Sequence, residues 1–468
     1  MHETYFLNSR YIMAATYTIT SSVLTLASGT PSGAIDLSSY TTVTRINTGI
    51  FNRAGITSIT LPPNLISITN SAFSGCTGLA SITLPTSLTT LGTGAFSGCT
   101  GLTSITLPSS ITSLGNNVFN GCTNLASVTF VGAATPIYSN LFTACKNITT
   151  LDLGVSSIPA STFAGFTKLA SVTLRPTVKS IGDTAFSGCT SLTSITLPST
   201  IATLGAQVFM NCTGLTSATI VGSTTLGNSI FQGCTNLTTL DIGIPTIPSA
   251  AFPGVTTLKT LILRPTVTAI GVNGFANRPS LTSVTLGSGL TTLGLGAFKN
   301  CTGLTSIVIP NSVTSIGNSA FSGCTNLASV TTGTGVQTVG NNAFGGCTNL
   351  ASVTIGTGVQ TVDSSAFRSC TALTSITIPD NVTTLGANVF HGCTNLARVT
   401  IGTGVRSIGL NTFANVANPV VHFNGSYPAG GYGKDIFVGN TSVKLFHKPA
   451  ATGWNSVTID GYSVTSAA

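Results

Sequence analysis

Charged residues are scarce in this sequence. Only 6% of its 468 residues are Asp, Glu, Lys or Arg, against roughly 25% in typical soluble domains. The nine acidic residues form no clustered carboxylate pair, and neither a G-x-S-x-G nor a G-x-x-x-x-G-K-[ST] motif is present. The four histidines, which lack the spacing of a metal site or a catalytic triad, are His2, His391, His422 and His447. We therefore expect no catalysis, no cofactor and no bound metal.

Long apolar runs and basic clusters are also missing. No segment reaches the roughly 18 uninterrupted apolar residues of a transmembrane helix, although 42% of the residues are apolar. The 17 basic residues, which give a formal net charge of +8, are scattered along the chain. Such scatter is not typical of nucleic-acid binding. The sequence predicts neither a membrane span nor a nucleic-acid partner.

The N-terminus lacks a classical export signal. Residues 1–22 contain no basic region, continuous apolar core and cleavage site of the kind that a secretory signal peptide has. Met13 is an alternative start to Met1, and residues 1–12 would then be an extension without a structural role. We expect no export by the general pathway.

What the sequence has instead is a repeat. Seventeen of its twenty-three phenylalanines recur at intervals of 21 to 23 residues. Self-similarity at a period of this length is the signature of a solenoid. The recurring residues are Phe51, Phe73, Phe96, Phe119, Phe142, Phe163, Phe186, Phe209, Phe231, Phe252, Phe275, Phe298, Phe321, Phe344, Phe367, Phe390 and Phe413.

Each repeat carries apolar residues at fixed positions, with turn residues between them. Alternation within residues 102–107 predicts a short strand whose Ser104 and Thr106 face outward. A glycine four residues before the Phe, such as Gly92, indicates a positive φ or a close backbone approach, and we expect one helical turn after it. The inward positions of one repeat are Leu102, Ile105, Leu107, Ile111, Leu114, Phe119 and Cys122.

This frame resembles the BspA-like, or treponemal-type, class of leucine-rich repeats. The hallmark of that class is I-G-x-x-A-F-x-x-C-x-x-L-x-x-I-x-I-P, which "SIGDTAFSGCTSLTSITLP" at residues 180–198 matches closely. The resemblance covers about residues 45 to 415. It implies a solenoid of about 17 repeats with one short parallel strand each, in a surface-exposed protein of a cell or a virion that acts in adhesion and binding.

The resemblance and the repeat boundaries together define the expected domains. We expect the leucine-rich repeat solenoid over residues 51–415, an N-terminal cap over 13–50 and a C-terminal cap over 416–468. Caps are needed because an uncovered solenoid end exposes strand edges and core. The only tryptophan, Trp454, and most tyrosines lie in the caps, where they either close the core or dock a partner.

All twelve cysteines stand three residues after a repeat phenylalanine. Stacked neighbours would lie within reach of a disulfide, but the consecutive runs of four, three and five cysteines cannot all pair. Ala54, Phe166, Val255 and Val416 fill the same position in other repeats. The pattern favours buried free thiols over disulfides, redox chemistry or metal binding. Arg278 is the remaining exception and predicts one locally distorted repeat.

The outward strand positions form two columns, meaning equivalent positions in successive repeats. Ser dominates the first column and Thr the second. Hydroxyls that satisfy one another across repeats would explain the columns without any ligand. A regular hydroxyl lattice that binds ice or glycan is the alternative, although the curvature of leucine-rich arrays counts against ice.

A few charges interrupt these columns. An Asp replaces the Thr twice, an Arg follows the strand of the next repeat each time, and one further Arg stands in the Ser column. They are either surface ion pairs worth roughly 0 to 1 kcal/mol or a specific contact site. The candidate ligand surface comprises Ser104, Thr106, Ser127, Thr129, Asp152, Arg175, Ser194, Thr196, Asp241, Arg264, Ser375, Thr377 and Arg398.

These features predict a non-catalytic recognition or adhesion scaffold that binds a protein or a glycan along its exposed sheet. The alternative is a structural component of a virion or a surface layer, with self-assembly through the caps. An ice-binding hydroxyl lattice is a further alternative.

Overall fold

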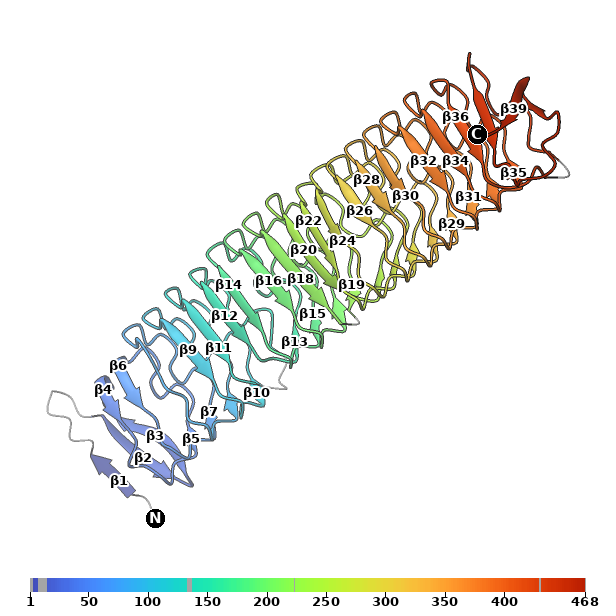
Figure 1. The fold of residues 1–468 in the computed structure, drawn as a ribbon. Coiled ribbons are helices and arrows are strands. Elements are labelled where there is room, and N and C mark those ends of the chain that lie inside the picture. Colours follow the sequence, from blue (N-terminus) through green and yellow to red (C-terminus); the bar gives the residue numbers. More distant parts are fainter. Residues whose placement is uncertain (1–2, 7–14, 133–136, 223, 429–430, 468) are drawn as a thin grey trace. The chain divides into compact units, whose positions relative to one another are not determined.

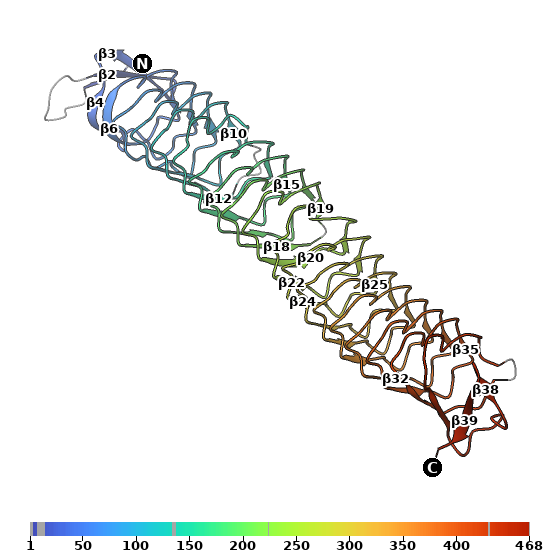
Figure 2. The same ribbon diagram turned by 90° about the horizontal axis from the view of Figure 1, so that it is seen from above.

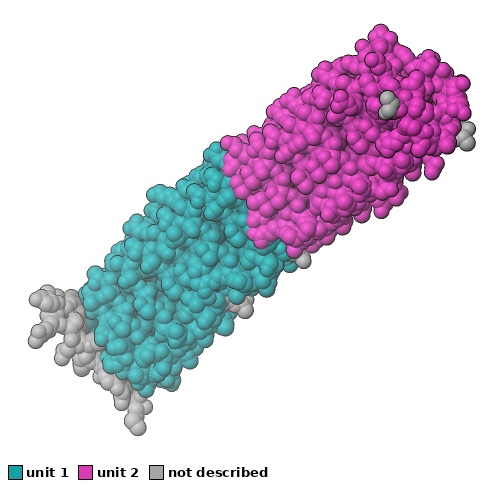
Figure 3. All heavy atoms as spheres, viewed as in Figure 1, with its two compact units in different colours: residues 1–237 teal, residues 238–468 magenta. Residues whose placement is uncertain are grey.

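A computed structural model describes residues 3–6, 15–132, 137–222, 224–428 and 431–467 of the chain (Figure 1). Within these ranges the regular structure consists of strands joined by turns, without any helix. The chain divides into two compact units, residues 1–237 and 238–468 (Figure 3). In the described residues, no helix of membrane-spanning length and hydropathy occurs.

Most repeats contribute a long strand of three to six residues and a short strand of two residues. Within a unit, the strands of successive repeats lie side by side and parallel, as Figure 2 shows from above. The predicted parallel strand is confirmed, and the leucine-rich solenoid with it. The short strand was not predicted, because two residues are too few to show a period.

In the first unit the long strands form in-register parallel ladders, so that Ser104 lies beside Ser127 and Thr106 beside Thr129. The long strands are β4 (Ser32–Asp36), β6 (Gly55–Thr60), β9 (Ser104–Leu107), β11 (Ser127–Phe130), β12 (Thr150–Leu153), β14 (Ser171–Leu174), β16 (Ser194–Leu197) and β18 (Ser217–Val221). The short strands are β5 (Arg45–Ile46), β7 (Ser67–Ile68), β8 (Thr90–Leu91), β10 (Ser113–Leu114), β13 (Ser157–Ile158), β15 (Ser180–Ile181), β17 (Thr203–Leu204) and β19 (Thr225–Leu226).

The second unit repeats this plan. Its long strands are β20 (Thr239–Gly243), β22 (Thr260–Leu263), β24 (Ser283–Thr285), β26 (Ser306–Val308), β28 (Ser329–Thr331), β30 (Ser352–Thr354), β32 (Ser375–Ile378), β34 (Arg398–Ile401), β36 (Val420–Phe423), β37 (Lys444–His447) and β39 (Tyr462–Ser466). The short strands are β21 (Thr246–Ile247), β23 (Ala269–Ile270), β25 (Thr292–Leu293), β27 (Ser315–Ile316), β29 (Thr338–Val339), β31 (Thr361–Val362), β33 (Thr384–Leu385) and β35 (Ser407–Ile408).

The core of each unit is a column of stacked phenylalanine rings. In the first unit, ring centroids from Phe51 to Phe231 follow one another at 4.9–5.8 Å. In the second, those from Phe252 to Phe413 do so at 5.3–5.8 Å. Such separations suit offset stacking. The inward residues predicted for one repeat, from Leu102 to Cys122, are all buried.

The segment between the short strand and the Phe is a succession of tight turns, so the predicted helical turn is wrong. Asn117 and Ser319 have φ of 56° and 54° there, which no helix accommodates. The N–H of Phe73 instead donates to the carbonyl of Ala95 in the next repeat at 2.8 Å. Bonds between repeats therefore replace the bonds within a helix.

The predicted glycine constraint is a close backbone approach. Gly92 lacks a positive φ, but a Cβ there would lie 2.5 Å from the backbone nitrogen of Asn70 and 2.6 Å from the carbonyl carbon of Thr69. The column of glycines thus allows the backbones of successive repeats to pack closely.

Both ends of the chain add strands to the ladders. At the N-terminus, β1 (Glu3–Phe6) and β2 (Thr16–Thr20) are antiparallel, as are β2 and β3 (Val23–Ser28). Residues 1–2 and 7–12 of the expected extension lie outside the described residues, whereas the backbone of β1 pairs with β2.

In the segment expected as the C-terminal cap, β36 and β37 continue the parallel ladder of β34. The ring of Phe437 stacks on that of Phe413 at 5.5 Å. The last strand, β39, pairs with β37 and with the antiparallel β38 (Thr458–Ile459). Trp454 is buried against Phe423 and Tyr427 and donates its indole N–H to the carbonyl of Gly425.

Candidate functional site

The outward side of the long strands, which we call the long-strand face, carries the residues proposed from the sequence. In β9, Ser104 and Thr106 are exposed while Ile105 and Leu107 are buried. The same alternation exposes Ser194 and Thr196 in β16 and Ser375 and Thr377 in β32. Ser127 and Thr129 in β11 are half-buried. Period-two alternation therefore gives each unit its own hydroxyl-rich face.

Within each ladder, the candidate residues lie beside equivalent residues of the next repeat. Ser104 and Ser127 are register partners, and so are Ser375 and Arg398. Adjacent strands of a sheet lie about 4.8 Å apart. The ladders thus bring together the candidates from neighbouring repeats but leave those from distant repeats apart.

The hydroxyls of the long-strand face are free. Ser104, Thr106, Ser127 and Thr129 make no side-chain hydrogen bond to another described residue. Threonines just before the long strands behave differently: for example, Thr149 donates to the carbonyl of Ala126 in the preceding repeat. The face hydroxyls therefore do not satisfy one another as expected, and their donors and acceptors are open to solvent or a ligand.

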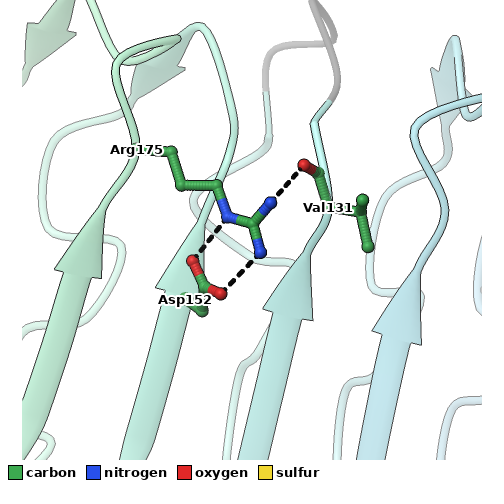
Figure 4. Close-up of polar contacts among 3 residues, drawn as sticks. All are labelled: Val131, Asp152 and Arg175. Atoms are coloured by element: carbon green, nitrogen blue, oxygen red, sulfur yellow. Dashed lines mark hydrogen bonds and ion pairs between the residues drawn. The ribbon is translucent and has the colours of Figure 1, made fainter.

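Four of the five charged residues proposed on this face occur as closed pairs. In the first unit, Nε and Nη2 of Arg175 donate to the two carboxylate oxygens of Asp152, each at 2.7 Å, and Nη1 donates to the carbonyl of Val131 at 2.5 Å (Figure 4). In the second unit, Arg264 holds Asp241 with the same two-pronged geometry at 2.8 and 2.7 Å. Each guanidinium spans adjacent strands, and its charge is neutralised by the carboxylate.

These pairs raise the pKa of Arg175 and Arg264, chiefly because each guanidinium donates hydrogen bonds to its carboxylate. The pairs are partly exposed: 34% of the Arg175 side chain and 32% of the Asp152 side chain are accessible. Solvent therefore screens their attraction. Arg398, by contrast, is exposed in the first column and forms no ion pair among the described residues.

The long-strand face of the first unit contains a hollow, which was not expected from the sequence. Its volume is about 420 Å³, and its wall includes Ser81, Thr83, Ser104, Thr106 and Val131. Residues 81–84 keep the buried and exposed alternation of a long strand but join no ladder. The break in the sheet beside β9 thus opens a polar hollow whose lining carries no charged side chain.

The twelve cysteines are buried free thiols. Each Sγ donates to the backbone carbonyl of the Phe in the preceding repeat, as Cys99 does to Phe73 at 3.0 Å and Cys347 to Phe321 at 3.3 Å. The carbonyls of Phe73 and Phe321 also accept the N–H of the cysteine in their own repeats. The thiol column thus supplies a second, weak donor to a buried acceptor.

Two other residues use the same position to donate to the same carbonyl. Arg278 donates from Nη2 to Phe252 at 2.7 Å, and Asn440 donates from its amide to Phe413 at 2.8 Å. Phe275 still stacks on Phe252 at 5.8 Å and on Phe298 at 5.6 Å. The stack of phenylalanine rings is therefore undisturbed, because the guanidinium takes the donor role of the thiol, and the predicted distortion is confined to the turn at residues 276–278. The sequence offered no sign of this role, since apolar residues occupy the position elsewhere.

Burial makes Cys145 and Cys347 poor nucleophiles. It raises the pKa of Cys145 to about 11 and that of Cys347 to about 12, and reactivity requires the thiolate. Among the described residues, no group of three or more His, Cys, Asp or Glu side chains is arranged to hold a metal ion.

Comparison with known proteins agrees with this architecture. A leucine-rich repeat solenoid is the class that the stacked repeats define. The family model for the BspA type leucine rich repeat region (6 copies) matches residues 44–163, 137–244, 225–333 and 291–419. The chain therefore belongs to the BspA-type leucine-rich repeat family.

Several solved structures are similar to the chain. A leucine-rich repeat protein from Bacteroides ovatus is 23% identical, with a TM-score of 0.42, over 84% of this chain and 94% of that protein. A leucine rich cell surface protein from Faecalibacterium prausnitzii is 23% identical, with a TM-score of 0.32, over 75% and 94%. The pneumococcal vaccine antigen PcpA is 15% identical, with a TM-score of 0.35, over 99% of both chains. No curated protein matches the chain.

Proposed function

We propose that this protein is a non-catalytic recognition or adhesion scaffold, displayed at the surface of a cell or a virion, which binds a protein or a glycan through its long-strand face. The free hydroxyls of that face carry the proposal. Ser104 and Thr106 are exposed and lack protein partners, so they can exchange hydrogen bonds with a ligand without breaking any in the protein. Membership of a family of repeat scaffolds supports the same function.

The hollow and the Asp–Arg pairs of this face carry no net charge, which defines the chemistry of a ligand bound there. The Asp–Arg pairs are closed on themselves, and the hollow is lined by hydroxyls and apolar groups. A neutral polar surface, such as the hydroxyls of a glycan or an uncharged stretch of protein, would match this lining. Asp152, Asp241 and the exposed Val308 interrupt the hydroxyl columns, which counts against a continuous ice-matching lattice.

The substitution S104R tests the proposal. It fills the hollow, and it copies a residue that the same column already contains, because Arg398 is the register partner of Ser375. The matched control is S113R, which places the same side chain on the exposed position of the short strand β10 in the same repeat.

Wild type and both variants would be screened on a glycan array and in pull-downs from the surface fraction of the source. We expect S104R to lose a ligand that wild type and S113R retain. Equal binding by all three proteins would exclude the hollow and its surroundings. A regular protein lattice in electron micrographs of the source would favour the alternative of a structural component.

A further inference from the structure

Arg278 is a buried cation in a column of thiols. Only 6% of its surface is exposed. Its guanidinium donates to three backbone carbonyls: Nη1 to Ala276 at 2.9 Å and to Asn277 at 3.3 Å, and Nη2 to Phe252 at 2.7 Å. A guanidinium has five N–H groups, so two remain without a partner. One of them is on Nε, which is buried and has no hydrogen bond among the described residues.

The charge of Arg278 is not balanced by a carboxylate. The ion pairs among the described residues involve Arg175 and Arg264, and none involves Arg278. Residues 238–330 contain four basic residues, Lys259, Arg264, Arg278 and Lys299, but one acidic residue, Asp241, which Arg264 already holds. Burial lowers the pKa of Arg278, although an arginine keeps its charge at neutral pH. A buried charge without a counter-charge is costly, so a bound anion would stabilise this region.

Arg278 is one of the residues that line a hollow of about 360 Å³. Its lining includes Arg278, Lys299, Asn273, Asn277 and Asn300, from two successive turns of the second unit. Lys299 is exposed, and its ammonium makes no hydrogen bond or ion pair with the described residues. The amide of Asn300 donates to the side-chain oxygen of Asn277 at 2.9 Å, so further amide N–H groups remain at the rim. The lining contains two cations and several amide donors but no carboxylate.

From this arrangement we infer that the hollow between Arg278 and Lys299 binds a small tetrahedral oxyanion, phosphate or sulfate, either free or as the terminal group of a larger ligand. Lys299 supplies a mobile ammonium and the asparagine amides supply neutral donors, while Arg278 supplies a fixed charge at the wall. The site lies on the turns that flank the phenylalanine column, not on the long-strand face. The test of this site is therefore independent of the function proposed above.

The full-length protein would be titrated with sodium phosphate and, separately, with sodium sulfate by isothermal titration calorimetry and thermal unfolding. Sodium chloride at matched ionic strength controls for screening. We expect saturable binding of at least one of the two oxyanions, with a melting temperature that rises above the chloride control. The oxyanion that binds more tightly shows whether the ligand group is a phosphate or a sulfate.

Two variants assign the binding to this hollow. R278C installs the residue that the column carries in twelve other repeats, so the donor to the Phe252 carbonyl is retained while the charge is lost. K299Q removes the exposed ammonium at the rim. We expect at least a tenfold weaker affinity for each variant and no change for K259Q, which removes an exposed lysine outside the hollow.

Wild-type behaviour indistinguishable from the chloride control would overturn the proposal. So would oxyanion affinity that survives both R278C and K299Q. If R278C fails to fold, the comparison of K299Q with K259Q still decides the question.

Discussion

The buried thiols should make the protein lose stability at alkaline pH. In the second unit, burial raises the pKa of Cys301 and Cys347 from the ordinary 9.0 to about 12, and it raises the pKa of Cys324 in the same direction. The folded state therefore keeps these thiols protonated where the unfolded state ionises them. The stability that they contribute is fully present below pH 9 and is lost as the pH rises from 9 towards 12.

The size of this loss is set by ionisation of the thiols in the unfolded state. It hardly depends on how far the folded protein raises the pKa of each thiol. One pH unit above its pKa, an unfolded thiol gains about 1.4 kcal/mol from ionisation. A buried thiol with a pKa near 12 forgoes nearly all of that gain at pH 10. Cys301, Cys324 and Cys347 together should thus lower the free energy of unfolding by about 4 kcal/mol between pH 8 and pH 10.

The triple variant C301V/C324V/C347V isolates this effect. Valine already occupies the column at Val255 and Val416, both of them buried. Urea denaturation of wild type and variant at pH 8, 9 and 10, followed by circular dichroism, gives the two pH dependences. Lysines and tyrosines titrate equally in both proteins and cancel in the difference. A wild-type loss that exceeds that of the variant by less than about 1 kcal/mol would refute the reasoning, as would thiolate absorbance at 240 nm that folded wild type shows at pH 10 and the folded variant lacks.

Four further predictions test other parts of the fold. Thiol titration at pH 8 should find no reactive group in the native protein and twelve after denaturation without reductant, since all twelve cysteines are buried and free; clearly fewer than twelve would indicate disulfides. F321A should cost about 3–5 kcal/mol in urea denaturation, because the ring of Phe321 is buried 5.4 and 5.3 Å from its two neighbours, and F321L should cost less but still destabilise, because leucine restores volume without the ring; a negligible cost for F321L would argue against ring stacking. G92A should lower the melting temperature more than G55A, because the new Cβ meets backbone at 2.5 Å at Gly92 but only a side chain at 3.5 Å at Gly55; the reverse order would contradict the close approach. A double-mutant cycle of D152N and R175Q should give a coupling of about 0–1 kcal/mol, since both side chains are about one-third exposed; a coupling above 2 kcal/mol would mean that solvent does not screen the pair.

The inward-facing residues of each repeat could be predicted from the sequence because the same packing positions recur from repeat to repeat. The Phe column, the long strand and the glycine contact all follow from residues that return at fixed spacing. The C-terminal end of the phenylalanine column could not be predicted from this spacing. Phe437 stands 24 residues after Phe413 and lacks the surrounding motif, yet its ring continues the stack.

Contacts between repeats were the part that the sequence concealed. The partner of each thiol is a backbone carbonyl 25 or 26 residues earlier, and a carbonyl has no signature in the sequence. The hollow beside β9 is hidden for a similar reason: residues 81–84 read "SITL", as do residues 104–107 of β9 itself, but only the latter join a ladder. Identical segments can thus differ in pairing because the ladder depends on both neighbours.

The division between inward and outward positions also indicates where substitutions would alter the binding proposed above. An inward residue contacts the repeats on both sides, as Phe321 does, so a substitution there disturbs three repeats at once. An outward residue such as Ser104 has no side-chain partner to lose, and the same column accepts an arginine at position 398. Substitutions on the long-strand face should therefore cost little stability while altering what the surface binds. The residues proposed to bind a ligand are consequently separable from those that govern folding. A loss of binding in S104R with an unchanged melting temperature would demonstrate that separation.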